Sequence, residues 1–311
     1  MEQFIGLDVS QQNTHVCVVN REGDVVWRGT CLSTPDDIAA TIRTRSSNAA
    51  RIGLETGPLS TWHWHALKKM GLPVICIDAR HAKAALTMQI NKTDRNDALG
   101  LAQIMRTGWY REVGVKSIEN HKIRAVLGAR AQLVSMRTDI RNQIRGLLKV
   151  FGVVLGRNDG KSFEEQVCEV ARNGDDTLQL SLRSLLATLS TVCEQVRTLD
   201  HMALGWAKDN PICRHLMSIP GVGALTSLAF VTAIEDPARF PKSCNVGAFF
   251  GLTPKRYQSG EKDTNGRISK WGDQPPAIRE QCNNHGYSWF FLGAGQVWPI
   301  DVLVCVKIAH W

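Results

Sequence analysis

The first third of the chain is built from short apolar runs separated by turn-forming or helical segments. Five runs are apolar at most positions and too short for a stable helix, so each predicts a strand. They cover residues 4–9, 15–19, 25–29, 51–55 and 73–77. Helical patterns follow Thr34, which precedes a proline suited to the first helical position, and fill residues 59–70. Three strands followed by alternating helices and strands predict an α/β structure with a mixed sheet.

Longer helical periodicity fills residues 113–210. Over residues 124–149 apolar side chains follow one side of the predicted helix and basic ones another, with Asp139 as the exception in sign. A solvated face of a packed helix explains this pattern, and so does contact with a phosphate backbone. The basic residues for which we predict nucleic-acid contact are Arg130, Arg137, Arg141 and Arg145. A second apolar stripe, over residues 182–199, predicts a core helix or a helix hairpin.

A glycine-bearing segment, Pro220-Gly221-Val222-Gly223, precedes an apolar run that ends at Ile234. Glycines before a helix leave backbone amides open. Gly221 and Gly223 therefore predict an anion site that holds a DNA phosphate without reading sequence. Pro-Gly-Val-Gly is also typical of a helix-hairpin-helix motif, and a tight turn between two helices is the alternative.

Residues 252–260 place a basic pair, Lys255 and Arg256, beside two hydroxyl groups, those of Tyr257 and Ser259. This composition predicts a surface loop with the capacity to bind DNA. A hydroxyl is a poor nucleophile unless a base, a metal or nearby cations lower the barrier. Lys255 and Arg256 supply the cations, but the sequence identifies no general base.

Composition and charge narrow the functional class. The chain has 311 residues, of which 43% are hydrophobic, a net charge of +8 and a pI near 9.1. These values favour a polyanionic partner, nucleic acid before membrane. Nine cysteines without a C-x-x-C pair argue against a zinc ribbon and suit a reducing compartment. No signal peptide is visible, and a proline and charges interrupt the one membrane candidate, residues 289–308, so we expect a soluble cytoplasmic protein.

Four carboxylates stand at the ends of predicted elements. Asp8 and Glu55 each close a strand, and neighbouring strands of one sheet bring such residues to the same edge. Thr93 is placed to cap a helix whose first turn carries Asp94 and Asp97 on one face. Converging, partly buried carboxylates are costly unless cations lie between them, so the combination predicts a site for a pair of Mg²⁺ ions.

Two basic side chains flank the second pair of carboxylates. Lys92 and Arg95 offer a simpler explanation, ordinary helix capping with surface ion pairs. They are also candidates for contact with nucleic acid.

Three segments together resemble the acidic blocks of the DEDD transposases of the insertion-sequence one-ten family. They are Ile5-Gly6-Leu7-Asp8-Val9, Leu54-Glu55-Thr56-Gly57 and Lys92-Thr93-Asp94-Arg95-Asn96-Asp97-Ala98. The resemblance covers about residues 4–273. It implies an RNase H-like, RuvC-like catalytic domain over residues 1–112 and a helical or coiled-coil region over 113–210. A mostly helical transposase domain with a helix-hairpin-helix motif follows over 211–273. The tail, 274–311, departs from the family pattern and looks like a shifted reading frame or a truncated end.

The function implied by this resemblance is that of a transposase, a site-specific DNA recombinase of an insertion sequence. Ser259 matches the family's nucleophilic serine, which attacks a DNA phosphate to form a phosphoserine link. The residues matching the acidic set that holds Mg²⁺ are Asp8, Glu55, Asp94 and Asp97. The implied partners are donor and target DNA and a bridge RNA that guides target choice. Further copies of the chain are also implied, as a dimer or tetramer in which the acidic set of one chain serves another's serine.

Two other functions are compatible with the same residues. A junction-resolving, metal-dependent nuclease would use the four carboxylates with water in place of serine. An inactive DNA-binding remnant, left by the altered tail, would keep the basic character without the chemistry.

Overall fold

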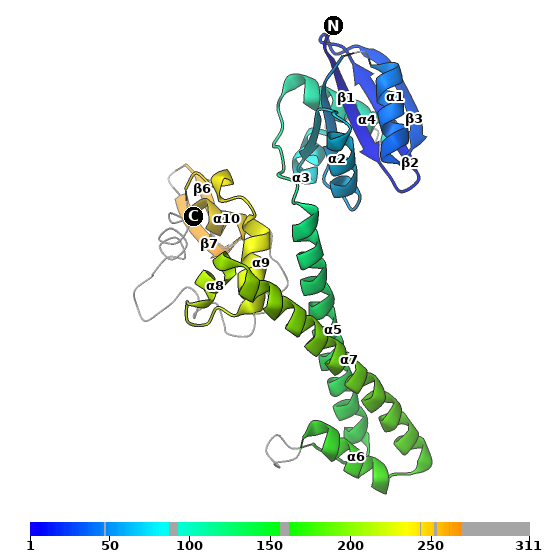
Figure 1. Ribbon diagram of the computed structural model, residues 1–311, viewed down its shortest axis with the longest axis vertical. Coiled ribbons are helices and arrows are strands. Elements are labelled where there is room, and N and C mark those ends of the chain that lie inside the picture. The colour runs from blue at the N-terminus through cyan, green and yellow to red at the C-terminus, as the bar shows by residue number, and fades with distance from the viewer. Residues whose placement is uncertain are drawn as a thin grey trace. The chain divides into compact units, whose positions relative to one another are not determined.

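The computed structural model describes residues 1–46, 48–86, 93–155, 162–242, 244–251, 254–260 and 262–268 (Figure 1). It divides into two units, Met1–Lys116 and Ser117–Trp311. The first unit thus ends close to the predicted boundary at residue 112. Lys92 and the predicted tail, 274–311, lie outside the described residues.

A five-stranded mixed sheet forms the centre of the first unit. Its strands are β1 (Gln3–Val9), β2 (Asn13–Val19), β3 (Val25–Leu32), β4 (Ala49–Glu55) and β5 (Val74–Ile77). They lie in the order β3-β2-β1-β4-β5, antiparallel from β3 to β1 and parallel from β1 to β5. The predicted mixed sheet is confirmed. The short turns between the first three strands enforce antiparallel pairing, and the helical crossovers between later strands allow parallel pairing.

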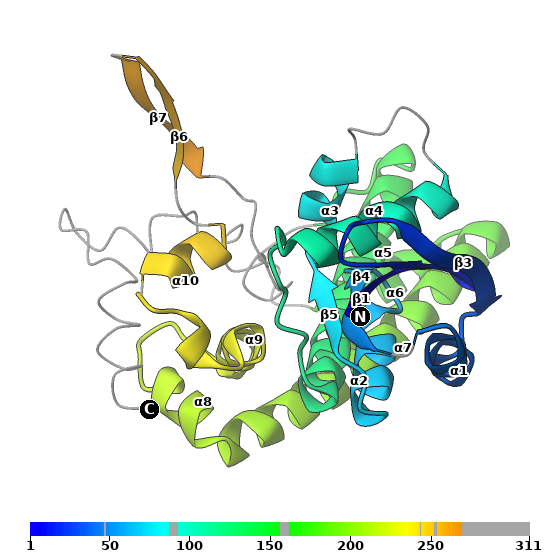
Figure 2. The same cartoon turned by 90° about the horizontal axis from the view of Figure 1, so that it is seen from above.

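Helices cover both faces of this sheet (Figure 2). The helices of the first unit are α1 (Pro35–Arg45), α2 (Ser60–Lys69), α3 (Ala79–Leu86) and α4 (Asp94–Thr107). Side chains of α1 and α2 pack with one core cluster, which includes Ile5, Leu7 and Leu54. Those of α4 pack with a second cluster on the other face, which includes Phe4 and Cys17. Successive residues of β1 therefore contribute to opposite cores, as strand alternation requires.

Helix capping follows the sequence closely. The hydroxyl of Thr34 accepts a hydrogen bond from the Asp37 amide, with proline at the start of α1. Gly71 follows α2 at a φ of 80°, a left-handed conformation that glycine adopts without steric cost. Both predicted boundaries are confirmed.

The second unit is mostly helical. Its helices are α5 (Ile118–Val150), α6 (Phe163–Asn173), α7 (Asp176–Asp209), α8 (Pro211–Met217), α9 (Ala224–Ile234), the 3₁₀ helix η1 (Pro237–Arg239) and α10 (Cys244–Phe249). The long helices α5 and α7 pack side by side. Leu127 lies near Ala203 at one end of the pair, and Ile144 lies near Leu182 at the other, so the two helices run antiparallel.

One predicted loop is instead a strand. Residues 252–260 are predicted as a surface loop, but β6 (Pro254–Ser259) pairs antiparallel with β7 (Lys262–Ile268). The sequence prediction is wrong here, because it relied on the polar composition of the segment and did not recognise Gly260 as a hairpin turn. Gly260, at a φ of 56°, supplies the left-handed residue that a two-residue hairpin loop requires.

Within the described ranges, no helix is long and apolar enough to cross a membrane. Six cysteines of those ranges are free thiols, which agrees with the absence of a pairing pattern in the sequence. The membrane candidate at residues 289–308 falls outside them.

Candidate metal centre and nucleic-acid interface

The sheet aligns polar residues from four strands in one row. Leu7 of β1 is in register with Leu54 of β4, so Asp8 and Glu55, which follow them, are neighbours at the ends of adjacent parallel strands. Asp8 is also opposite His15 of β2, and His15 is opposite Thr30 of β3. Side chains in register point to the same face of a sheet. The row therefore has acidic side chains on β4 and β1, and a histidine and a threonine on β2 and β3.

Two glycines let α4 lie close to this row. A Cβ atom added to Gly6 would lie less than 3.0 Å from the Ala98 carbonyl oxygen and the Ala102 amide nitrogen. A Cβ atom at Gly53 would lie 2.6 Å from the Met105 side chain. Because β1 and β4 have no side chain at these positions, the helix axis approaches the sheet closely. The first turn of α4 is thereby brought to this row, where Asp94 contacts His15 of β2.

The first turn of α4 carries the second pair of carboxylates. Thr93 caps the helix, its hydroxyl accepting a hydrogen bond from the Asn96 amide, as the sequence predicts. Asp97 is partly buried, and the Asp94 side chain is 69% exposed. The Oδ2 atom of Asp94 lies 3.6 Å from Nε2 of His15, which joins the helix to β2.

The pKa of Asp8 responds to the other three carboxylates of the predicted acidic set. The pKa of Asp8 is raised to about 6, chiefly by burial and next by the negative charges of Asp94, Asp97 and Glu55, while His15 lowers it. Nearby carboxylates make ionisation of Asp8 costly. The role of these four residues as one metal-binding set stays a prediction.

The donor set is of the kind that binds a hard divalent cation. Carboxylate oxygens are the ligands that Mg²⁺ prefers, and clustered negative charge rewards its binding. The carboxylates therefore fit the ion in the chemistry of their oxygen ligands. Within the described residues, however, no three histidine, cysteine, aspartate or glutamate side chains already form a group able to hold a metal ion.

His15 is a member of the site that the sequence analysis does not single out. Its ring contacts Asp94 through Nε2 and the Thr30 hydroxyl through Nδ1, at 3.4 Å. The signal was a polar residue inside the apolar strand 15–19. Its position opposite Asp8 depends on the hairpin register, which the sequence alone does not specify.

The basic face of α5 is partly neutralised within the chain. Arg130, whose side chain is only 17% exposed, forms an ion pair with Asp200 of α7. Arg141 pairs with Glu164 of α6 at 3.0 Å, and the guanidinium groups of Arg141 and Arg145 lie over the Phe163 ring. These partners come from other helices.

Arg137 differs from these three arginines. Among the residues that the structure describes, Arg137 has neither an ion pair nor a contact with an aromatic ring. Contact with a nucleic-acid backbone, as predicted for this basic face, therefore stays the prediction for Arg137.

Ser259 is the last residue of β6 and is exposed, with Lys262 of β7 opposite it. Tyr257, the rival hydroxyl, lies two residues earlier on the same strand and is 62% exposed. Lys255 and Arg256 also lie on β6. The basic pair and the two hydroxyl-bearing residues thus belong to one short strand.

Gly221 and Gly223 lie between α8 and α9 and are exposed. Gly221 has a φ of 85°, and Gly223 is the N-cap of α9 without a side-chain cap. The amides of the first turn of α9 are therefore not capped by a side chain of Gly223, which is compatible with an anion site and also with a plain interhelical turn.

Comparisons with known proteins cover most of the chain. Residues 5–152 match a family model described as a transposase, the DEDD transposase of IS110. Residues 213–276 match the model of the "Transposase IS116/IS110/IS902 family". The transposase for insertion sequence element IS1111A of Coxiella burnetii is 29% identical over 280 residues, which are 87% of this chain and 74% of the relative. The probable family 20 transposase of Pseudomonas aeruginosa is 25% identical, over 86% of this chain and 79% of the relative.

Among solved structures, Thermus thermophilus RuvC aligns with a TM-score of 0.29 and 15% identity, over 36% of this chain and 99% of that one.

Proposed function

This chain belongs to the IS110 family of insertion-sequence transposases, and from that premise we propose that it cuts and joins DNA strands as a site-specific recombinase. We assign its first unit to the RNase H-like, RuvC-like class. The strand order β3-β2-β1-β4-β5 and the acidic residues at the ends of adjacent parallel strands support that assignment. The transposase domain is proposed to lie in the second unit, with Pro220–Gly223 as its helix-hairpin-helix turn.

The observation that supports this function most strongly is the convergence of carboxylates at Asp8. Burial and, after it, three acidic side chains from α4 and β4 raise the pKa of this group, although like charges in one place oppose folding. A chain keeps such an arrangement at a cost in stability. Binding of a cation for catalysis explains that cost better than helix capping does.

The residues that would hold Mg²⁺ are Asp8, Glu55, Asp94 and Asp97. When bound there, Mg²⁺ supplies positive charge that polarises a DNA phosphate. His15 holds Asp94 from the β2 side, and Thr93 fixes the start of α4. The chain's own contribution is thus to present oxygen ligands on a rigid sheet and helix, where their positions vary little.

Ser259 is proposed as the nucleophile. Its Oγ atom forms a bond to the DNA phosphorus, the bond from phosphorus to one flanking DNA oxygen breaks, and the hydroxyl proton ends on the released oxygen. Because the phosphoserine link is itself a phosphodiester, its formation is readily reversible. Attack by the hydroxyl of another DNA end then releases the serine and joins the strands. Lys255 and Arg256, on the same strand, are proposed to offset the charge of the pentavalent phosphate.

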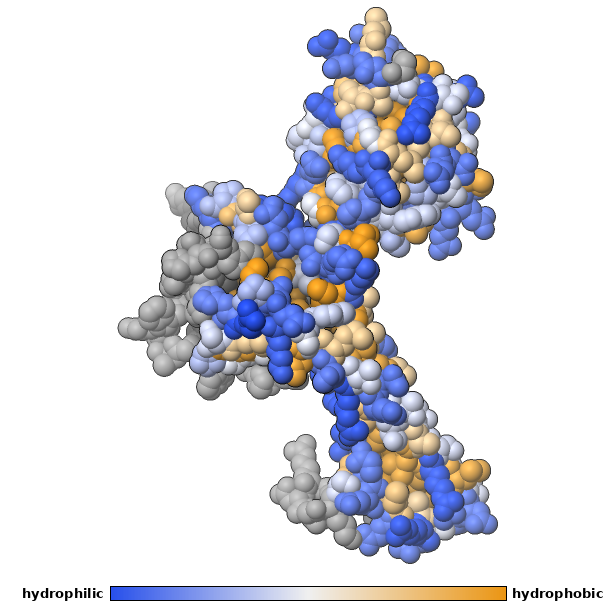
Figure 3. All heavy atoms as spheres, in the orientation of Figure 1, coloured by the Kyte–Doolittle hydropathy of each residue, from blue (hydrophilic) through white to orange (hydrophobic). Residues whose placement is uncertain are grey.

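Self-association and a guide RNA complete the proposal. The tip of the helical pair exposes Val150, Phe151 and Leu180, and the face seen in Figure 3 shows hydrophobic residues along these helices between hydrophilic ones. Exposed apolar side chains support a contact between copies of the chain, as a dimer or tetramer. A bridge RNA that guides target choice is proposed on the family resemblance alone.

Covalent trapping tests the proposed chemistry. The chain is incubated with Mg²⁺ and a DNA fragment that carries the insertion element with its flanks, then denatured. We expect a protein–DNA adduct with wild type and with Tyr257→Phe, and none with Ser259→Ala or Asp8→Asn. Cleavage at the wild-type rate by Ser259→Ala would instead assign the chain to the water-dependent nucleases. DNA binding without cleavage by wild type would identify an inactive remnant.

A further inference from the structure

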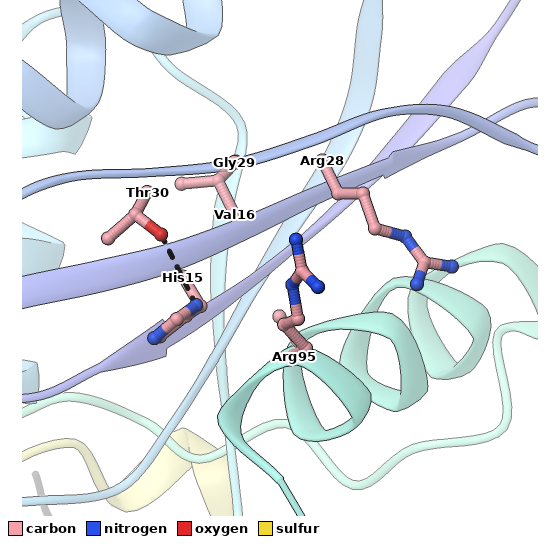
Figure 4. A pocket seen from close by; sticks show the side chains of 7 residues that line it. His15, Val16, Arg28, Gly29, Thr30 and Arg95 are labelled. Carbon is pink, nitrogen blue, oxygen red and sulfur yellow. Dashed lines mark hydrogen bonds between the residues drawn. The ribbon is translucent and has the colours of Figure 1, made fainter.

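A small open cavity lies beside the acidic residues, between strands β2 and β3 and helix α4. Its charged and polar walls are His15 of β2, Arg28 and Thr30 of β3, and Arg95 of α4. Figure 4 shows the Arg28 side chain on strand β3 and the Arg95 side chain on helix α4, with His15 hydrogen-bonded to Thr30. The metal-site proposal uses neither Arg28 nor Thr30.

The two guanidinium groups have no internal counter-charge. Neither Arg28 nor Arg95 forms an ion pair with any carboxylate in the part of the chain that the structure describes. The Cys17 thiol, a weak acceptor, is a hydrogen-bond partner of Arg28. Two positive charges that line one cavity repel each other, and an anion bound in the cavity reduces that repulsion. Arginine is suited to this role because its planar group matches phosphate oxygens two at a time.

The cavity continues the row of residues that contains the acidic set. Thr30 is in register with His15, which is in register with Asp8. Two strand spacings separate β3 from β1, so the cavity and the acidic residues are about 10 Å apart across the sheet. A nucleic-acid backbone covers that distance within a few nucleotides. A strand with one phosphate at Asp8 therefore places a neighbouring phosphate near Arg28 and Arg95.

We propose that this cavity is a phosphate subsite, in which Arg28, Arg95 and Thr30 bind a backbone phosphate of the DNA strand that passes the acidic set. The subsite rests on the proposed function, because it needs a strand at Asp8. It fixes the strand's position without reading bases, since phosphates carry no sequence information. DNA rather than RNA is the ligand because the neighbouring acidic set is proposed to act on DNA.

Salt-dependent DNA binding by the full chain tests the subsite. The probe is a mixed-sequence DNA duplex of about 30 base pairs, carrying a fluorophore for anisotropy, and an RNA duplex of the same sequence serves as the second arm. The variants are Arg28→Gln, Arg95→Gln and their combination. Arg21→Gln is the matched control, because Arg21 is an exposed arginine of the same unit, in the turn before β3 and outside the cavity.

We expect the double variant to bind DNA about tenfold more weakly at low salt and its slope of log K against log salt to fall by about one. The Arg21→Gln control should keep affinity within about twofold, as expected for loss of one exposed charge that contacts no phosphate. Unchanged binding by the double variant would overturn the subsite, and so would an equal loss in the control. A larger loss for RNA than for DNA would overturn the choice of ligand.

Two measurements keep this test separate from the proposed function. Thermal melts show whether the variants fold. A lower melting temperature for both single variants would mean that Arg28 and Arg95 stabilise the fold, which would contradict a surface subsite that only binds phosphate. Asp8→Asn should retain the wild-type salt slope while losing cleavage. If Asp8→Asn still cleaves, the metal assignment fails, whereas the effect of Arg28 and Arg95 on binding is measured independently.

Discussion

At the scale of single residues, the account depends on Asp8 and its neighbours. The acidic residues were predictable because each stands at the end of a strand or in the first turn of a helix, where the sequence pattern places it directly. His15 and Arg28 were not predictable. Both lie within strands, and their approach to Asp8 and Arg95 depends on strand register and helix placement. Register is specified by packing over the whole sheet rather than by the local sequence.

The raised pKa of Asp8 predicts a stability effect of Asp8→Asn in metal-free buffer. A carboxyl group whose folded pKa exceeds its unfolded value stabilises the fold only while protonated. That contribution is complete below about pH 4 and is lost as the pH rises through about 6. Asp8→Asn should therefore raise the free energy of unfolding at pH 7.5 by about 1–3 kcal/mol, a gain that disappears near pH 4. Thermal melts across this range measure it.

Added Mg²⁺ provides the control for that prediction. A ligand that binds only the folded state stabilises it in proportion to its occupancy, so Mg²⁺ should raise the melting temperature of wild type more than that of Asp8→Asn. Equal or lower stability of Asp8→Asn at every pH would show that the carboxylates do not oppose one another.

At the scale of elements, close approach of α4 to the sheet brings the two pairs of carboxylates together. The sequence predicts the helix, its Thr93 cap and the strands, because periodicity and capping residues are local signals. The distance of the helix from the sheet is not local, since it depends on Gly6 and Gly53 facing α4. The β6–β7 hairpin was missed for a related reason. Its pairing partner lies beyond the segment whose polar composition suggested a loop.

Gly6→Ala tests the role of this approach. The added methyl group would overlap the backbone of α4, so we expect a loss of about 2–4 kcal/mol in unfolding free energy, or displacement of the helix with loss of DNA cleavage. Gly57→Ala is the control, because nothing lies within 4 Å of its added Cβ atom. Wild-type stability and cleavage in Gly6→Ala would mean that α4 does not require contact with β1.

Two arginines of α5 are expected to have different roles, because Arg130 forms an ion pair within the chain and Arg137 forms none with the described residues. Removing Arg130 leaves Asp200 of α7 without its ion pair, so Arg130→Ala should lower the unfolding free energy by about 1–2 kcal/mol. Arg137→Ala should leave stability unchanged and weaken DNA binding, with a smaller salt slope. Chemical denaturation and anisotropy titrations measure the two effects. The reverse pattern would mean that Arg137 is structural and that Arg130 contacts the phosphate backbone.

At the scale of the whole molecule, a net charge of +8 favours DNA as partner, but the charge alone says nothing about where binding occurs. The acidic set belongs to the first unit and Ser259 to the second. The sequence predicts this separation of the two sets of functional residues along the chain. Which chain of an assembly completes the chemistry is a property of the oligomer, and no single-chain pattern encodes it.

Mixing two inactive variants addresses that property. If the acidic set of one chain serves another's serine, Asp8→Asn and Ser259→Ala proteins assembled together should regain the covalent DNA adduct, carried by the Asp8→Asn chain. Each variant alone is the control. Co-assembly without an adduct would show that each chain relies on its own residues.

Anomalous diffraction from Mn²⁺ tests whether the four carboxylates bind the proposed catalytic cation. Crystals of the full chain are soaked in Mn²⁺, which takes the same oxygen ligands as Mg²⁺. If the proposed metal site is correct, we expect an anomalous peak at about 2.1 Å from carboxylate oxygens of Asp8 and of at least one of Asp94 and Asp97. The absence of a peak there, at a Mn²⁺ concentration that supports DNA cleavage in solution, would contradict it.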